Sequence, residues 1–165
     1  MTYLDIEIRS IEEKDIPSVL EIEKLCFKAP WKKEDILREM NENPYSNFWV
    51  IELTDPNTKS KSVVGFSNYW KTFESATITQ IAIHPYLQRH QLGSALMDEI
   101  INDCYAKRVR TLTLEVRLSN SKAISFYKKH GFKETLLKKN YYSNGEDALY
   151  MTLEVEQAYD HDTSN

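Results

Sequence analysis

The stretch that decides the fold is ATITQIAIHPYLQRHQLGSALMDEIINDCYAKRVRTLTLEVR, residues 76 to 117. Residues 76 to 84 are rich in β-branched residues and stop at Pro85, which is typical of a strand. Between Gly93 and Lys107 the apolar residues recur at helical spacing, at Leu96, Met97, Ile100, Ile101 and Cys104. Residues 111 to 117 alternate as a second strand. The stretch therefore predicts one strand-helix-strand crossover.

The part of the chain before this stretch predicts a strand, two helices and a hairpin. Ile6, Ile8 and Ile11 frame the strand, and a helix from Asp15 to Phe27 is expected to be capped by its first residue. A second helix fits Lys33 to Met40. Two segments rich in β-branched and aromatic residues then flank a turn-like Asp-Pro-Asn sequence, which predicts an antiparallel hairpin over residues 47–53 and 62–72.

The part after it predicts a helix and a final pair of strands. The helix runs from Ser121 to Lys129, with Gly131 as its C-terminal stop. The strands fit Lys133 to Tyr142 and Ala148 to Val155, around a Ser-Asn-Gly-Glu turn. The element order β α α β β β α β α β β predicts an α/β fold with a mixed, mostly antiparallel sheet and helices on both faces.

Length and composition predict a single folded domain. With 165 residues and 41% hydrophobic residues, the chain is about one domain's worth, which we expect to span residues 1–156. Residues 157–165 are polar and are expected to be disordered. A net charge of -4 argues against a general phosphate-backbone binder, because such affinity comes from clustered Lys and Arg. Nucleic acid is therefore not expected as a direct partner.

Cysteines and hydropathy favour a cytoplasmic protein. Cys26 and Cys104 have no metal-ligand spacing and are interpreted as buried, reduced thiols. The acidic N-terminus does not resemble a signal peptide, and no segment approaches the ~18 apolar residues of a membrane span. The four histidines lack ligand spacing as well, so the sequence predicts neither a membrane partner nor a metal.

The loop PYLQRHQLGSA, residues 85–95, lies between the predicted crossover strand and its helix. Backbone N–H groups at a helix start, helped by the helix dipole, can bind a pyrophosphate. Arg89 and His90 could add positive charge there. Many strand-to-helix turns with Gly and polar residues hold no ligand, so the loop alone leaves both interpretations open.

Three strings carry a family resemblance: IAIHPYLQRHQLGSALMDEI at 81–100, LTLEVRLSNSKAISFYKKHGF at 112–132, and KKNYYSNGEDALYM at 138–151. Together they resemble the GNAT acetyltransferases, most closely the ribosomal-protein-alanine N-acetyltransferase type. The resemblance is close over residues 81–151 and loose elsewhere. It implies the GNAT acyl-CoA N-acyltransferase fold, acetyl-CoA as the donor and an α-amino group as the acceptor.

The resemblance also implies two catalytic residues. Glu115 is similar to the family's general base, which takes a proton from the attacking ammonium directly or through water. Tyr127 matches the tyrosine that returns a proton to the departing thiolate. By their patterns alone, Glu115 could be a charged residue on the solvent face of a strand, and Tyr127 a packing aromatic beside Phe126 and Ile124.

Acetyl-CoA binding is implied for a strand segment, the loop and two later positions: Ile81, Ala82, Ile83, Gln88, Arg89, His90, Gln91, Leu92, Gly93, Ser94, Asn120 and Tyr127. A backbone N–H near Ile81 to Ile83 is expected to stabilise the oxyanion. Asn120 could instead be only a helix N-cap. Gln91 stands where the family usually has glycine, and a positive φ there would cost about 1–2 kcal/mol.

Acceptor binding is implied for Phe27, Trp31, Tyr141 and Tyr142. Phe27 and Trp31 fall on the family's acceptor-side loop but could equally be packing residues. Adjacent tyrosines on a strand would point to opposite faces, so one could pack while Tyr142 lines a peptide groove.

The function predicted from these observations is N-α-acetylation of a protein, with the N-terminal alanine of a small-subunit ribosomal protein as acceptor and partner. One alternative is acetylation of a small amine or a lysine side chain, because this fold accommodates many acceptors. Another is a non-catalytic acyl-CoA-binding module, for which Gln91 is the only hint.

Overall fold

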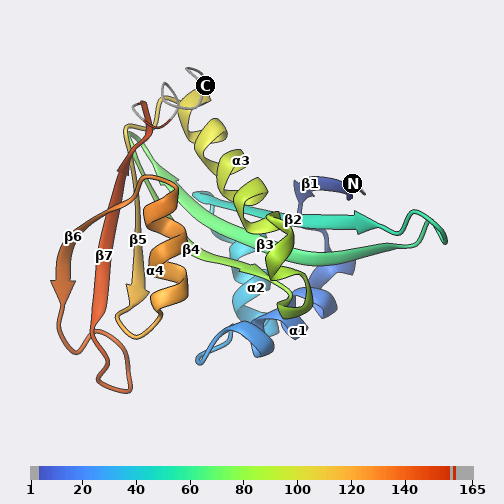
Figure 1. Ribbon diagram of the computed structural model, residues 1–165, viewed down its shortest axis with the longest axis horizontal. Coiled ribbons are helices and arrows are strands. Elements are labelled where there is room, and N and C mark those ends of the chain that lie inside the picture. The colour runs from blue at the N-terminus through green and yellow to red at the C-terminus, as the bar shows by residue number, and fades with distance from the viewer. Residues whose placement is uncertain (1–3, 157, 159–165) are drawn as a thin grey trace. The chain divides into compact units, whose positions relative to one another are not determined.

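The computed structural model describes residues 4–156 and residue 158. The chain divides into two compact units, Met1–Tyr69 with Gln80–Leu96 and Trp70–Thr79 with Met97–Asn165. Its strands are hydrogen-bonded in the order β1-β2-β3-β4-β5-β7-β6. Figure 1 labels the elements. A single domain over residues 1–156 stays a prediction, and the tail predicted at 157–165 lies outside the described residues except for residue 158.

The first unit contains the N-terminal elements and parts of three others. These elements are β1 (Asp5–Ser10), η1 (Glu13–Asp15), α1 (Ile16–Cys26), α2 (Lys33–Asn41), β2 (Ser46–Thr54), β3 (Lys61–Thr72), β4 (Ser75–Ile83), η2 (Pro85–His90) and α3 (Leu92–Ala106), of which β3, β4 and α3 contribute residues to both units. β1 pairs with β2 antiparallel. The predicted helices and the hairpin are confirmed, whereas the 3-10 helix η2 was not predicted.

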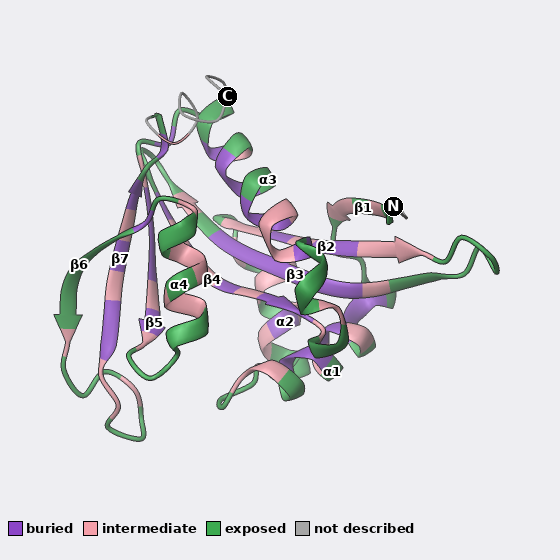
Figure 2. Cartoon of the chain, viewed as in Figure 1, coloured by how far each residue is buried: buried purple, intermediate pink, exposed green. Residues whose placement is uncertain are grey.

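Helices cover both faces of the sheet within the first unit. Val50 and Phe66 pack in a cluster with Val19 of α1 and Ile36 of α2. The neighbouring Ile51 belongs to a second cluster, which also contains Val64, Ile83, Leu92 and Leu96. Since successive strand residues point to opposite faces, α1 and α2 lie on one face and the first turns of α3 on the other. The arrangement predicted from the element order is confirmed here, and Figure 2 shows the buried middle of β3.

Asp15 does not cap α1 through its side chain, so that prediction is wrong. Its backbone is already helical, at φ -85° and ψ -14°. The carboxylate instead accepts the Glu12 N–H at 2.8 Å and forms two hydrogen bonds of 2.8 Å with the guanidinium of Arg9. The reason is that η1 precedes α1 directly, so the cap serves the 3-10 turn rather than the α-helix.

The second unit is built on three further strands and a helix. These are β5 (Thr111–Arg117), α4 (Ser121–Lys129), β6 (Lys133–Lys138) and β7 (Ala148–Glu154). β4 pairs with β5 in parallel from Ser75 opposite Thr111 to Ile78 opposite Leu114, while β7 pairs antiparallel with both β5 and β6. The parallel pair is the predicted crossover, and Gly131 ends α4 with a φ of 98°.

The strand predicted for residues 133–142 ends at Lys138, so Tyr141 and Tyr142 do not lie on opposite faces of a strand. Asn140 adopts a φ of 53°, which breaks the extended backbone, and its N–H donates to Asp147 Oδ1 at 2.9 Å. The Tyr142 N–H donates to the Glu146 carbonyl at 3.1 Å. These local hydrogen bonds close a loop and replace the strand ladder.

The two cysteines and the lengths of the helices can be compared with the sequence predictions. Neither cysteine forms a disulfide. The predicted burial is confirmed for Cys104 but is wrong for Cys26, which is only half-buried because its Sγ reaches the Ile83 carbonyl near the surface loop. Burial raises the pKa of the Cys104 thiol to about 12, so it stays protonated. Within residues 4–156 and 158, no helix has the length and apolar character needed to cross a membrane.

Gly65 permits the close approach of β3 to its neighbours. A Cβ at this position would lie 2.4 Å from Ile83 Cδ1, 2.8 Å from the Ala82 carbonyl oxygen and 2.9 Å from Ile51 Cγ2. The Ala82 oxygen belongs to the backbone, so it cannot move without shifting β4. The absent side chain therefore fixes where the Ala82–Ile83 segment lies.

We predict that Gly65→Ala lowers the free energy of unfolding by about 1–3 kcal/mol, because the new methyl group overpacks the sheet. Urea denaturation followed by circular dichroism measures the change. Ser62→Ala, at an exposed position of the same strand, is the control and should stay within about 0.5 kcal/mol of the parent chain. A Gly65→Ala loss no larger than that of the control would contradict the prediction.

Glu23 is a fully buried carboxyl group on α1. Its Oε2 accepts the Trp31 N–H at 3.0 Å and the Gln80 amide at 3.2 Å. Burial is the largest effect on this group and, despite those hydrogen bonds, raises its pKa from 4.5 to about 7. The folded chain therefore binds a proton at Glu23 under conditions in which the unfolded chain has lost it.

A raised carboxyl pKa lowers stability as the pH rises. Between about pH 4.5 and 7 the folded state holds more protons at Glu23 than the unfolded state, so its contribution falls across this window and is constant above it. We predict that Glu23→Gln removes this dependence, so that the variant gains on the order of 3 kcal/mol relative to the parent between pH 4.5 and 8, at about 1.4 kcal/mol per pKa unit. Urea unfolding at several pH values tests this, and parallel curves would refute it.

Candidate active site

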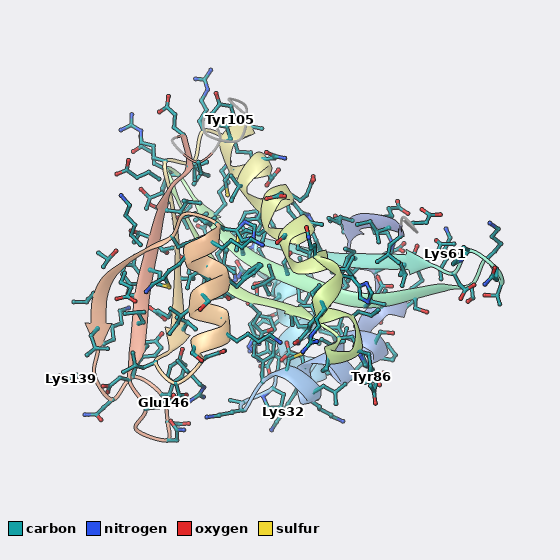
Figure 3. The ribbon with its side chains drawn as sticks, viewed as in Figure 1. Lys32, Lys61, Tyr86, Tyr105, Lys139 and Glu146 are labelled. Atoms are coloured by element: carbon teal, nitrogen blue, oxygen red, sulfur yellow. The ribbon has the colours of Figure 1, made fainter. Side chains whose placement is uncertain are left out.

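The first unit contains the residues predicted for the donor loop. His84 precedes η2, and its Nδ1 accepts the Tyr86 N–H at 3.3 Å while the two rings stack at 5.4 Å. Tyr86 itself is 90% exposed and is labelled in Figure 3. Pro85 occupies the first turn of η2, where its missing N–H costs nothing, and is the sequence signal that could have revealed this 3-10 helix.

Gln91 joins η2 to α3 in a left-handed conformation, with φ 59° and ψ 21°. The positive φ considered from the sequence is therefore confirmed. The Gln91 carbonyl accepts the Ala95 N–H at 3.1 Å, and the buried Leu92 anchors the first turn of α3. Arg89 and His90 are exposed just before this turn, so the charge of Arg89 lies next to the positive end of a helix dipole. Such a helix start suits a phosphate group.

The strand segment Ile81 to Ile83 is largely buried, with Ile81 half-buried. The Ile83 carbonyl accepts from Cys26 Sγ at 3.4 Å and from Gln88 Nε2 at 3.2 Å. The Gln88 side chain therefore turns back onto β4. The backbone N–H that would stabilise an oxyanion in this segment stays a prediction.

Phe27 and Trp31 pack against the core of the first unit. The Phe27 ring lies 6.5 Å from that of Phe66, and the Trp31 ring lies 6.3 Å from that of Phe48. Both side chains are half-buried, which fits the packing interpretation while leaving part of each ring accessible. Their contact with an acceptor stays a prediction.

Glu115 lies in a polar and aromatic cluster of the second unit. Its Oε1 accepts a hydrogen bond from Lys138 Nζ, which also lies 5.3 Å from the Tyr141 ring centre and 4.8 Å from that of Tyr150. The Glu115 side chain is 25% exposed, so it is neither free on the solvent face nor fully buried. A hydrogen bond from Tyr141 to Glu115 is the main cause that raises the Tyr141 pKa to about 12. The Glu115 carboxylate thus accepts hydrogen bonds from both Lys138 and Tyr141.

Tyr127 is half-buried on α4, with its ring 5.5 Å from Phe126 and 5.8 Å from Phe132. Its pKa is raised, first by burial and then by Tyr142. The phenol therefore stays protonated at neutral pH and can act as a proton donor but not as a base. Packing and catalysis are both compatible with this position.

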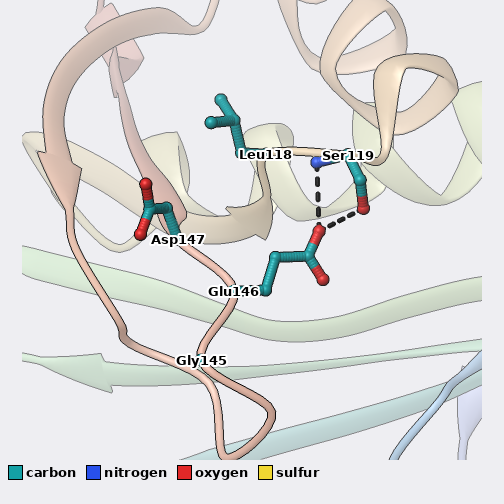
Figure 4. A pocket seen from close by; sticks show the side chains of 5 residues that line it. All are labelled: Leu118, Ser119, Gly145, Glu146 and Asp147. Carbon is teal, nitrogen blue, oxygen red and sulfur yellow. Dashed lines mark hydrogen bonds between the residues drawn. The ribbon is translucent and has the colours of Figure 1, made fainter.

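Asn120 caps α4, since its side chain accepts the Ala123 N–H at 3.1 Å. The N-cap interpretation is confirmed, and contact with acetyl-CoA stays a prediction. Next to this cap a pocket of about 420 Å³ is lined by Leu118, Ser119, Gly145, Glu146 and Asp147 (Figure 4).

Glu146 connects the two chain segments that line this pocket. It accepts hydrogen bonds from the Ser119 hydroxyl and from the Ser119 N–H, the latter at 3.2 Å, and pairs with Arg117 at 3.0 Å. The Arg117 guanidinium in turn lies 3.9 Å from the Tyr142 ring centre. Together these contacts connect the end of β5 to the loop that carries Tyr142.

The sequence did not predict roles for Lys138, Glu146 or Glu23. The first two lie inside the string KKNYYSNGEDALYM, which marked the segment without indicating contacts. Glu23 falls on the apolar stripe of α1, seven residues after Ile16 and four after Val19, which was a detectable sign of burial. Among the residues that the structure describes, no group of three or more His, Cys, Asp or Glu side chains is arranged to hold a metal ion.

Comparison with known proteins gives a consistent result. Residues 16–132 match the acetyltransferase (GNAT) family. A Bacillus subtilis relative, provisionally named a [ribosomal protein bS18]-alanine N-acetyltransferase, is 38% identical over 151 residues, covering 91% of this chain and 96% of its own. The crystal structure of the ribosomal-protein-S18-alanine N-acetyltransferase from Escherichia coli is 32% identical and has a TM-score of 0.77, covering 92% of this chain and 94% of its own.

A more distant structure shares only the fold. The spermidine N-acetyltransferase from Vibrio cholerae, solved with CoA and spermine, is 18% identical with a TM-score of 0.77, and covers 93% of this chain and 98% of its own. The same fold therefore accommodates acceptors of different chemistry.

We predict that Gln91→Gly raises the free energy of unfolding by about 0.5–1 kcal/mol, because relief of left-handed strain exceeds the entropy that glycine adds to the unfolded chain. Thermal and urea unfolding measure the change. Arg89→Gly is the matched control, since Arg89 is exposed in the same loop and is not among the positive-φ residues, and it should instead lose about 0.5–1 kcal/mol. Equal losses in both variants would show that Gln91 is not strained.

Proposed function

This chain belongs to the acetyltransferase (GNAT) family, and we propose that it transfers the acetyl group of acetyl-CoA to the N-terminal alanine of a ribosomal protein of the bS18 type. The observation that carries this proposal is the similarity, over at least nine-tenths of the chain, to two alanine N-acetyltransferases named for that substrate. A ribosomal acceptor would be met in the cytoplasm.

The proposed base is Glu115. The acceptor amine must lose a proton, and the carboxylate of Glu115 is partly exposed and can take that proton directly or through water. Lys138 forms an ion pair with this carboxylate, and its side chain must move away when the ammonium group of the acceptor approaches. The amine nitrogen then forms the bond to the acetyl carbonyl carbon.

The proposed acid is Tyr127. As the carbon-sulfur bond breaks, the electron pair goes to sulfur, and the phenol of Tyr127 supplies the proton that makes the free thiol. The phenol carries its proton at neutral pH, as this role requires, although burial raises its pKa. An ammonium acceptor loses two protons in all, one to Glu115 before the attack and one from the nitrogen after the carbon–nitrogen bond has formed. One of these protons balances the proton that Tyr127 donates to sulfur, and the other is released to water.

Donor binding is proposed for the loop after β4. The first turn of α3, with Arg89 and His90 exposed before it, supplies N–H groups and positive charge suited to the pyrophosphate. Bound acetyl-CoA supplies the activated thioester. Asn120 and the segment Ile81 to Ile83 are proposed to hold the pantetheine arm and orient the carbonyl group.

Acceptor binding is proposed for four aromatic side chains. Tyr141 is 48% exposed and its hydroxyl bonds the proposed base, so it is suited to contact the peptide next to the reacting amine. The position of the Tyr142 ring is fixed by the Arg117 guanidinium, which lies over it. Phe27 and Trp31 each leave part of a ring accessible for the first acceptor side chain.

A peptide panel tests the acceptor. Peptides that begin with Ala, Ser, Met or Gly, and one whose only free amine is a lysine side chain, are incubated with acetyl-CoA and analysed by mass spectrometry. We expect transfer to the α-amino group of the peptide that begins like the ribosomal protein. Transfer to lysine alone would favour the side-chain alternative, and CoA binding without any transfer would favour a non-catalytic module.

Two substitutions test the proposed chemistry. We expect Glu115→Gln and Tyr127→Phe each to lower kcat by about 10²–10⁴-fold while CoA affinity measured by calorimetry changes little, because only proton transfer is removed. Glu134→Gln, at an exposed strand position, is the control and should keep full activity. Unchanged kcat in either active-site variant would remove that residue from the mechanism.

A further inference from the structure

Glu23 binds both ends of the connection between α1 and α2. Its backbone carbonyl accepts the Phe27 N–H at 3.0 Å, and its side-chain Oε2 accepts the Trp31 N–H at 3.0 Å. One residue therefore fixes the first and last positions of the five-residue segment that carries both aromatic side chains proposed for the acceptor. These two hydrogen bonds at the ends of the segment limit its movement.

The same carboxyl group also reaches β4. Gln80 is buried and donates its amide to Glu23 Oε2 at 3.2 Å. Three residues further along, the Ile83 carbonyl accepts from Cys26 Sγ at 3.4 Å. Two side chains of α1 thus hold the two ends of the segment Gln80 to Ile83, whose middle is proposed to orient the thioester.

A carboxyl group is a costly way to provide these bonds if packing were its only role. Glu23 is 0% exposed, and its Oε1 has no hydrogen-bond partner among the described residues, nor has Gln80 Oε1. Burying a carboxyl group costs several kcal/mol unless its hydrogen bonds compensate, and an apolar residue of similar volume is often at least as stable. The bonds to Trp31 and Gln80 are what an apolar residue cannot supply.

We propose that Glu23 is a positioning residue for acetyl transfer, which holds the Phe27 to Trp31 segment against the β4 segment that ends at Ile83. This rests on the proposed function. Glu23 acts through Trp31 and Gln80 and touches no reacting atom, so it affects how the acceptor is placed rather than how its proton is removed. A small displacement of a positioning segment is enough to lower the rate substantially.

The test compares three variants. Glu23→Met fills a similar volume but accepts no hydrogen bond. Glu23→Gln keeps an acceptor oxygen for Trp31 and Gln80, and its new amide can donate to Gln80 Oε1. Glu21→Ala is the matched control, because Glu21 lies on the same helix with its side chain 68% exposed.

Kinetics with an alanine-starting peptide should separate these variants. At a temperature well below the unfolding midpoint, we expect Glu23→Met to raise the acceptor KM by about 10-fold or more, whereas Glu23→Gln stays within about threefold and Glu21→Ala within about twofold. A folded Glu23→Met with unchanged acceptor KM would overturn the proposal, as would Glu23→Gln being equally impaired. If Glu23→Met does not fold, Gln80→Met removes one link and should raise the same KM by about fivefold or more, which exceeds the change allowed for Glu23→Gln. A folded Gln80→Met with unchanged KM would then overturn the proposal.

A second readout does not depend on activity. Hydrogen exchange at the Trp31 amide, followed by NMR, should be at least about 10-fold faster in Glu23→Met than in the parent chain and should be restored in Glu23→Gln. Equal exchange in all variants would overturn the positioning role. A parent chain that acetylates no peptide but shows this exchange pattern would refute the proposed function while leaving the arrangement around Glu23 supported.

Discussion

Parallel pairing of β4 with β5 is the constraint on which the rest of the structure depends. Two parallel neighbours cannot be joined by a tight turn, so the chain must leave the end of β4 and return through a helix. That requirement creates η2, the left-handed Gln91 and the start of α3 in succession. A helix N-terminus beside exposed Arg89 and His90 is the result, and it is the feature that suits a phosphate-bearing donor.

The position of β4 also depends on two unusual residues of the first unit, a glycine within a strand and a buried carboxyl group. Because Gly65 has no side chain, β3 can approach the Ala82–Ile83 segment closely. The carboxyl group of Glu23 is removed from water, and it accepts hydrogen bonds from Gln80 and Trp31. Both features fix the position of β4, but only the buried carboxyl group of Glu23 does so at the expense of stability. Residues that lower stability in this way are typical of functional regions, where a fixed geometry is required for activity.

In the second unit, ion pairs and hydrogen bonds position the residues proposed for catalysis and acceptor binding. Lys138 and Tyr141 hold the carboxylate of Glu115, while Glu146 and Arg117 hold the loop that carries Tyr142. Partly buried ion pairs of this kind gain from geometry and hydrogen bonding rather than from attraction alone. They hold the proposed base and the aromatic side chains around it in a defined arrangement.

The sequence by itself determined the elements, their order, the crossover and the segments that carry the proposed chemistry, because apolar periodicity and short motifs depend on near neighbours along the chain. It also anticipated the strain at Gln91. It missed the early end of β6 at Lys138, where local hydrogen bonds around Asn140 outweigh strand propensity, and the cap of η1 by Asp15. Only the tertiary structure decided which groups meet, as Glu23 with Gln80 and Lys138 with Glu115, since partners 57 and 23 residues apart leave no local signal of their pairing.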